Sequence, residues 1–130
     1  TIVDDFGDTV NPILLAGQIH GGIVQGMAQA LSENTVYADD GQLLTASFMD
    51  YTMPRADDFP PFSFETRNVP STTNPMGLKG AGEAGSIGST PAVMNAVADA
   101  LWRAYRVEHI DMPATPFAVY GAIKRSRAHA

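Results

Sequence analysis

The chain has 130 residues, the size of one ordinary domain, and 45% of them are hydrophobic while 17% are charged. This composition supports a buried core and excludes a disordered chain, and the absence of cysteine excludes disulfides and thiolate metal sites within the segment. Eight Lys and Arg residues against 14 Asp and Glu residues give a net charge of −6, which excludes the basic surface that nucleic-acid binding needs.

A first helix is predicted from about Leu14 to Ser32, after a turn at Asn11-Pro12. Its apolar side chains recur at helical spacing. The helix also contains Gly21, Gly22 and Gly26, and each glycine costs about 1 kcal/mol relative to alanine in a helix interior. A helix of this composition is expected to pack very closely against another element.

Short strands are predicted in the middle of the chain. Residues 35–37 and 43–45 flank Asp40-Gly41, which favours a hairpin with a glycine-containing turn. Residues 62–69 alternate two sets of side chains in the manner of a strand. Residues 107–110 suit one further short strand. These segments predict a small sheet, either mixed or antiparallel.

Two further helices are predicted in the second half of the chain. Thr90-Pro91 and Thr115-Pro116 each place a capping Thr before a Pro that suits the first helical position. These signals predict helices that run to about Tyr105 and Arg125. The expected fold class is α+β, with about three helices packed on the small sheet, and residues 1–130 are expected to form a single unit.

The glycine-rich segment 77–88 is the most informative part of the sequence, and no regular structure is expected from 70 to 88. Glycines at 80, 82, 85 and 88 let a backbone approach a ligand closely and adopt positive φ. Glu83 lies among them, beside Ala81 and Ala84. A carboxylate deprived of water is a better proton acceptor, so Glu83 is a candidate general base. The alternative is a surface loop with an exposed Glu.

The predicted first helix also carries an uncharged polar stripe within a narrow arc, formed by Gln18, Gly22, Gln25 and Gln29. Glutamine amides donate and accept hydrogen bonds, so the stripe suits a polar ring system at short range. The alternative is an ordinary solvated face, although exposed helix faces usually carry Lys and Glu.

The remaining polar residues are assigned structural or solvated roles. His20 lies beside the stripe and is expected to be a structural or surface histidine rather than a ligand or base. Asp4, Asp5 and Asp8 form a loose acidic cluster without the spacing of a calcium loop, so solvation is their expected role. No metal-ligating set is predicted.

Two motifs, in this order and at this separation, resemble a known family. Residues 17–26 read Gly-Gln-Ile-His-Gly-Gly-Ile-Val-Gln-Gly, and residues 80–85 read Gly-Ala-Gly-Glu-Ala-Gly. Together they resemble the C-terminal part of the molybdenum-binding large subunit of the xanthine oxidase family, and most of all the aerobic-type carbon monoxide dehydrogenase branch. The resemblance covers nearly the whole chain. It implies the C-terminal portion of a molybdopterin-binding domain, truncated at its N-terminus.

The resemblance implies roles for particular residues. In this family a glutamate at the position of Glu83 is the base that activates a molybdenum-bound hydroxyl group. A glutamine at the position of Gln18 hydrogen-bonds the pterin. The backbone before the glutamate contacts the cofactor, which assigns cofactor binding to Lys79, Gly80, Ala81 and Gly82.

The implied cofactor is molybdenum-molybdopterin in its cytosine dinucleotide form, with FAD and 2Fe-2S clusters on partner subunits. The implied partners are the remainder of the large subunit, an iron-sulfur subunit, an FAD subunit and a small-molecule substrate. The composition leads us to expect no nucleic-acid partner and no membrane span. The implied reaction oxidises an aldehyde, an N-heterocycle or carbon monoxide with oxygen from water. The expected location is cytoplasmic, with the periplasm left open, and the chain alone is expected to be inactive.

Two alternatives to an enzyme segment stay open. One is a non-catalytic module that binds a partner or an anion through the glycine-rich segment 77–88, because closely spaced backbone N–H groups bind anions. The other is an enzyme-derived segment that is retained for structure only.

Overall fold

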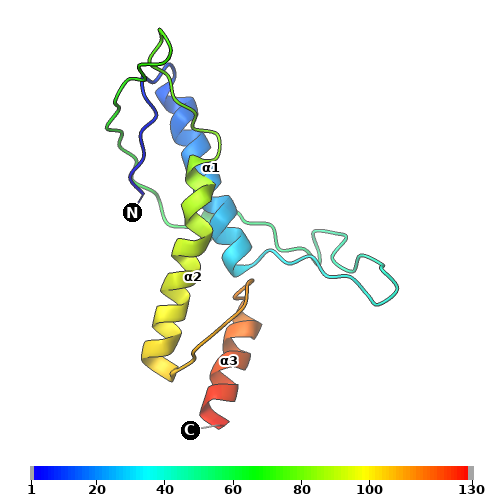
Figure 1. The fold of residues 1–130 in the computed structure, drawn as a ribbon. Coiled ribbons are helices and arrows are strands. Elements are labelled where there is room, and N and C mark those ends of the chain that lie inside the picture. Colours follow the sequence, from blue (N-terminus) through cyan, green and yellow to red (C-terminus); the bar gives the residue numbers. More distant parts are fainter. Residues whose placement is uncertain (1, 129–130) are drawn as a thin grey trace.

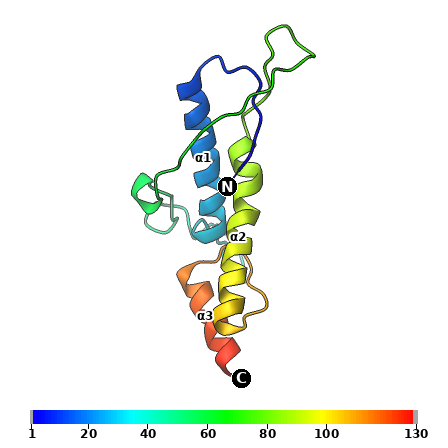
Figure 2. The same ribbon diagram turned by 90° about the vertical axis from the view of Figure 1, so that its left-hand side faces the viewer.

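The computed structural model describes residues 2–128, which form three α-helices joined by long irregular segments (Figure 1). The helices are α1 (Pro12–Leu31), α2 (Ala84–Tyr105) and α3 (Pro116–Ala128). A short 3₁₀ helix, η1 (Ala56–Asp58), lies between α1 and α2 in the sequence. Helices α1 and α2 pack side by side, and α3 packs against the C-terminal half of α2 (Figure 2).

Helices α1 and α2 run in the same direction and touch through small residues. Gly22 and Gly26 of α1 and Gly85 of α2 are all buried in this contact. A Cβ atom on Gly85 would lie 2.4 Å from the carbonyl oxygen of Ile19, so only glycine permits this backbone approach. The close packing predicted for the first helix is confirmed at Gly22 and Gly26. It is wrong for Gly21, which has no neighbour within 4 Å of its Cβ position among the described residues.

Helix α3 begins at its predicted Thr-Pro signal, whereas α1 begins at Pro12, within the predicted turn and two residues before its predicted start at Leu14. The side chain of Asn11 caps α1 by accepting hydrogen bonds from the N–H groups of Ile13 and Leu14, at 3.1 Å each. The hydroxyl oxygen of Thr115 accepts a hydrogen bond from the N–H of Ala118 at 3.2 Å, in the first turn of α3. Both helices therefore begin at a Pro that follows a capping residue.

Helix α2 begins well before its predicted start at Thr90-Pro91. The helix starts at Ala84, so Pro91 lies inside it, and Gly85 and Gly88 are helical instead of lying in a loop. Thr90 does not cap the helix, because its hydroxyl donates a hydrogen bond to the carbonyl of Gly26 on α1, at 3.1 Å. Packing on α1 stabilises the early turns of α2, and a local start signal cannot reveal such packing.

The predicted sheet is wrong: within residues 2–128 the β pairing consists of two isolated bridges, Tyr37–Leu43 and Gly7–Leu78. The first bridge lies in the predicted hairpin, whose turn contains Gly41 at φ 86°. This hairpin belongs to residues 32–55, which form an arm that extends away from the helices (Figure 1). No described segment continues the pairing there. A two-stranded ribbon alone is marginally stable, so the pairing ends after one bridge.

The other two predicted strands are also irregular segments. Residues 62–69 are not paired as a strand, although Phe62 and Phe64 are half-buried and pack beside His20 of α1. Residues 107–110 lie in the link between α2 and α3. Two of them, Val107 and Ile110, join a small apolar core whose other members are Val97, Leu101, Val119, Ala122 and Ile123. The fold of the described residues is therefore mostly helical.

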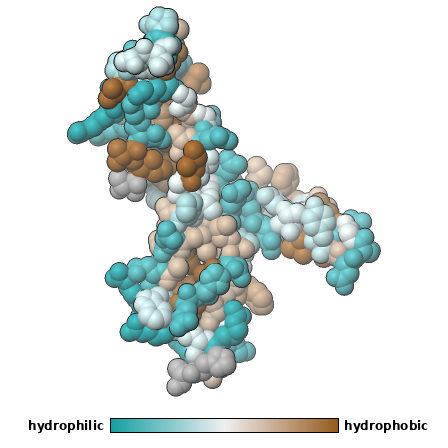
Figure 3. Space-filling model, in the orientation of Figure 1, coloured by the Kyte–Doolittle hydropathy of each residue, from teal (hydrophilic) through white to brown (hydrophobic). Residues whose placement is uncertain are grey.

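Large apolar side chains reach the surface on every part of the molecule (Figure 3). They include Ile13 on α1, Phe48 and Met49 on the arm, and Phe117 on α3, each at least 80% exposed. Exposed apolar patches of this kind are typical of surfaces that other protein covers. Over residues 2–128, no helix combines the length and the hydropathy that a membrane crossing requires.

Candidate cofactor-binding site

Gln18 of α1 and the segment before α2 lie in direct contact, although they are 64 residues apart in the sequence. The side-chain Nε2 of Gln18 donates a hydrogen bond to the carbonyl oxygen of Gly82 at 2.6 Å. Gln18 is exposed, and its Oε1 atom accepts no hydrogen bond from residues 2–128. The structure thus brings together the two motifs that the sequence singles out.

Residues 80–83, which we call the amide segment, have backbone N–H groups without partners. None of these four N–H groups donates a hydrogen bond to any atom of the described chain, 2–128. A Cβ atom on Gly80 or Gly82 would meet no described atom within 4 Å. Four free donors on an open backbone can bind an anion or a ligand rich in oxygen and nitrogen acceptors.

The predicted backbone conformation of the glycines in this region is wrong. Among residues 2–128 the glycines with positive φ are Gly7, Gly41 and Gly77, so neither Gly80 nor Gly82 is left-handed. Their contribution to the site is the absence of a side chain. Gly85, by contrast, serves the contact between α1 and α2.

Glu83 is the N-cap residue of α2, with φ −113° and ψ 2°. Its carbonyl oxygen accepts hydrogen bonds from the N–H groups of Ser86 and Ile87, at 3.0 and 3.1 Å. Its side chain does not cap the helix, is exposed, and pairs with no residue of the described chain. Ala81 and Ala84 therefore do not desolvate the carboxylate, contrary to the expectation from the sequence, and the group is free to meet a ligand.

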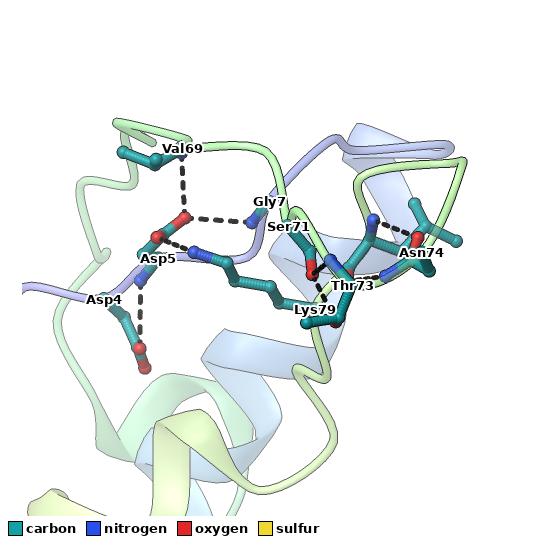
Figure 4. Close-up of polar contacts among 9 residues, drawn as sticks. Asp4, Asp5, Gly7, Val69, Ser71, Thr73, Asn74 and Lys79 are labelled. Atoms are coloured by element: carbon teal, nitrogen blue, oxygen red, sulfur yellow. Dashed lines mark hydrogen bonds and ion pairs between the residues drawn. The ribbon is translucent and has the colours of Figure 1, made fainter.

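Lys79 directs its ammonium group away from the amide segment and forms an ion pair with Asp5 (Figure 4). The carboxylate of Asp5 also accepts hydrogen bonds from the N–H groups of Gly7 and Val69, at 3.0 Å each. The hydrogen bond from Lys79 is the largest cause that lowers the pKa of Asp5 to about 2, and the two backbone hydrogen bonds add to it. Asp5 therefore stays ionised. The solvated role that the sequence predicts for the acidic cluster is wrong for Asp5, because its carboxylate bonds Lys79, Gly7 and Val69.

A tight turn precedes Lys79 and is held by Asn74. The Oδ1 atom of Asn74 accepts hydrogen bonds from the N–H groups of Met76 and Leu78, and its Nδ2 donates to the carbonyl of Leu78 at 2.9 Å. The carbonyl of Gly77 accepts hydrogen bonds from Asp8 and from Ser71, at 2.9 Å each. No role is predicted for Asn74 from the sequence, although an Asn-Pro pair before a Gly is a turn signal.

His20 lies on α1 among aromatic side chains, and its structural or surface role stays a prediction. Its ring packs against Phe62 and Phe64 with centroid distances of 5.7 and 6.0 Å, and its Nε2 atom is buried without a partner among the described residues. The ring lines a cavity of about 390 Å³ between α1, α2 and residues 61–65. Most of the other lining residues are apolar, including Ile23 and Met27 of α1.

The predicted polar stripe of α1 is only partly formed. Gln18, Gln25 and Gln29 are exposed, but Gly22 is buried under α2. Of the three glutamines, Gln18 is the one with a hydrogen bond to the amide segment. Within 2–128, no three His, Asp or Glu side chains lie close enough together to hold a metal ion.

Comparison with known proteins gives consistent matches over this chain. The family model described as a molybdopterin cofactor-binding domain matches residues 1–60, which include Gln18 but not Glu83. The nicotine 6-hydroxylase large subunit of Paenarthrobacter nicotinovorans is 43% identical over 122 residues, which cover 94% of this chain and 15% of that protein. The carbon monoxide dehydrogenase large chain of Hydrogenophaga pseudoflava is 37% identical over 122 residues, with the same two coverages of 94% and 15%.

A solved structure shares the fold. The Cu,Mo-CO dehydrogenase in its carbon monoxide reduced state superposes with a TM-score of 0.87 at 34% identity, covering 98% of this chain and 16% of that one. The chain thus spans about 15% of the length of the curated relatives it matches. The match to the cofactor-binding domain, the identities and the shared fold show that the chain belongs to the xanthine oxidase family of molybdopterin-dependent oxidoreductases.

Proposed function

We propose that residues 1–130 are the C-terminal portion of a molybdopterin-binding domain and form one wall of the cofactor site in a molybdenum-dependent hydroxylase or dehydrogenase. The observation that carries this proposal is the hydrogen bond from Gln18 to Gly82, which joins the two motifs at the start of α2. Because the chain spans about 15% of its curated relatives, the activity belongs to the whole large subunit and its partners.

The hydrogen-bonding groups at this wall fit a molybdopterin cofactor. Pterin and phosphate groups carry oxygen and nitrogen acceptors that suit the free N–H groups of the amide segment. The open Cβ positions of Gly80 and Gly82 let such a group approach the backbone, and the free Oε1 of Gln18 can accept a hydrogen bond from it. When bound, the molybdenum cofactor supplies the redox chemistry, while the protein supplies position and proton transfer.

Glu83 is proposed as the general base. It directly follows Gly82, whose carbonyl accepts the hydrogen bond from Gln18, and its side chain is exposed and unpaired within residues 2–128. Such a carboxylate is available to take the proton from the water-derived hydroxyl group that is transferred to the substrate. The bound cofactor and the rest of the large subunit would then remove water from around it and strengthen it as a base.

The finer properties of the complete protein follow from the family. The cofactor is proposed to be the cytosine dinucleotide form, and electrons are proposed to leave through 2Fe-2S clusters and FAD on partner subunits in the cytoplasm. The substrate is proposed to be an aldehyde, an N-heterocycle or carbon monoxide. The names of the relatives support the range of this proposal, since one is a nicotine 6-hydroxylase and another a carbon monoxide dehydrogenase.

Replacement of Glu83 in the full-length protein tests the proposed base. The Glu83→Gln variant should retain its molybdenum and lose turnover by roughly 10²-fold to 10⁴-fold, which is the usual contribution of a general base. Glu108→Gln is the matched control, because Glu108 is also exposed and follows the C-terminal end of α2, about 30 Å away along the helix. Near-normal turnover of Glu83→Gln with molybdenum bound would remove Glu83 from this role.

A non-catalytic, anion-binding module is the second candidate, and the free N–H groups at the start of α2 favour it. The two candidates differ in what the intact protein contains. Elemental analysis of the purified full-length protein should find molybdenum if the first proposal holds. Absence of molybdenum together with measurable binding of inorganic phosphate would favour the module.

A further inference from the structure

The amide segment is fixed at both ends, while its own N–H groups remain unpaired within residues 2–128. It is only four residues long. The path of so short a segment is set mainly by the positions of its two ends, since its interior makes few bonds of its own. Any group that fixes one end therefore controls where the four free donors lie.

The end that leads into α2 is fixed by α1. The carbonyl of Gly82 accepts the hydrogen bond from Gln18, and α2 begins at Ala84. One residue later, Gly85 packs against the backbone of Ile19. Helix α1 therefore fixes the position of this end of the segment, and α1 also carries Gln18, the residue expected to hydrogen-bond the pterin.

The other end is fixed by the N-terminal segment of the chain. The N–H of Lys79 donates a hydrogen bond to the carbonyl of Phe6 at 3.1 Å, and its ammonium group pairs with Asp5. The two side chains are each 35% exposed, so about two thirds of this pair is shielded from water. Lys79 is thus held twice: its backbone bonds Phe6, and its side chain pairs with the adjacent residue, Asp5.

Asp5 joins three segments that are distant in sequence, as Figure 4 shows. Its Oδ1 atom accepts hydrogen bonds from Gly7 and from Val69, while its Oδ2 atom pairs with Lys79. All three partners are donors, so the site requires two acceptor oxygens. An asparagine here would keep Oδ1 but would present an NH₂ donor to the ammonium group, which repels it.

We propose that Asp5 is a positioning residue for the cofactor: by holding Lys79, its carboxylate fixes the path of the amide segment and so the placement of its four donors. This inference rests on the proposed function. It assigns to Asp5 no contact with the cofactor or with the reacting atoms. Its effect passes through Lys79, in the way that outer residues orient the direct ligands of a metal.

The Asp5→Asn variant of the full-length protein tests the inference. Molybdenum per protein chain is measured after purification and then during dialysis, together with the thermal midpoint. Because loss of an outer partner weakens a bound metal by about 10-fold to 100-fold, Asp5→Asn should lose molybdenum at least about 10-fold faster than the wild type. Asp4→Asn is the matched control, because within residues 2–128 the Asp4 side chain bonds only the N–H of Asp5 and the Asn retains that acceptor.

Lys79→Gln removes the same ion pair from its other end and leaves the backbone bonds of Asp5 in place. It should show the same faster loss of molybdenum, and the double variant should be no worse than either single one. A lower thermal midpoint with an unchanged rate of molybdenum loss would overturn the inference, because it would show a purely structural role. Wild-type protein without molybdenum would overturn the proposed function itself, whereas equal retention by wild type and Asp5→Asn would overturn only the role of Asp5.

Discussion

Gly22 of α1 and Gly85 of α2 bring their backbones into contact: a Cβ atom on Gly22 would lie 3.0 Å from the Cα atom of Gly85. This contact lies one helical turn after Gln18 and two residues after Glu83. It sets the separation of the two helices at the level where Gln18 reaches Gly82. The contact between Gly22 and Gly85 thus brings the side-chain amide of Gln18 against the backbone of Gly82.

Replacement of Gly85 by alanine should separate the two helices. The added Cβ atom would lie 2.4 Å from the carbonyl oxygen of Ile19 and 3.0 Å from the N atom of Ile23, and neither backbone atom can rotate away. Overpacking of this kind costs about 1–3 kcal/mol. We expect a lower thermal midpoint and a lower molybdenum content in the full-length Gly85→Ala protein.

Gly121→Ala is the control for that variant. In α3 the added Cβ atom would meet, outside the neighbouring helix backbone and among residues 2–128, only the tip of the flexible Arg125 side chain within 4 Å, at 3.3 Å. Because alanine favours a helix over glycine by about 1 kcal/mol, Gly121→Ala should leave the midpoint unchanged or raise it. Equal midpoints for Gly85→Ala and the wild type would show that the helix contact tolerates a methyl group.

The parts of the fold and site that could be predicted from the sequence are those with local signals. Thr115 is predicted as the cap of α3, and the Asn11-Pro12 pair, predicted as a turn, marks the start of α1. The juxtaposition of Gln18 with the segment before Glu83 follows from the two family motifs, and the structure brings these segments together. The close packing of the first helix follows from the cost of its glycines, and it is confirmed at Gly22 and Gly26.

The parts that could not be predicted depend on contacts between distant segments. The hydroxyl of Thr90 bonds the backbone of α1, so the Thr-Pro signal there is not a helix start. Asp5 sits in a run of acids that reads as solvated, yet its partners Val69 and Lys79 lie more than 60 residues away. The predicted sheet failed for the same reason, because pairing requires neighbours that none of the described segments provides.

The ion pair of Asp5 predicts a specific response to acid. The pKa of Asp5 is about 2 in the folded protein, below its ordinary value of 3.8, so the folded state binds fewer protons than the unfolded state between these values. The stabilisation from the ionised group is fully present above its unfolded pKa and is lost as pH falls through the folded pKa. The difference in thermal midpoint between wild type and Asp5→Asn should therefore be constant from pH 7 to about pH 5 and should shrink below about pH 4.

Thermal melts of both proteins across this pH range provide the measurement. The Asp4→Asn variant should differ from the wild type by a small amount, because among the described residues the carboxylate of Asp4 bonds only the N–H of Asp5. A difference between wild type and Asp5→Asn that changes mainly between pH 8 and pH 6 would show that another group is responsible.

Pro91 and Pro116 follow threonine in the same way, yet they occupy different positions in their helices. Pro91 lies inside α2, where it offers no N–H to the carbonyl of Ile87, whereas Pro116 is the first residue of α3, where an N–H would have no helical partner. Proline in a helix interior costs up to about 3 kcal/mol, so Pro91→Ala should raise the thermal midpoint of the full-length protein, while Pro116→Ala should leave it nearly unchanged. Equal effects of the two substitutions would contradict the placement of Pro91 inside a continuous helix, and would favour a helix that starts at Thr90-Pro91 as the local signal indicates.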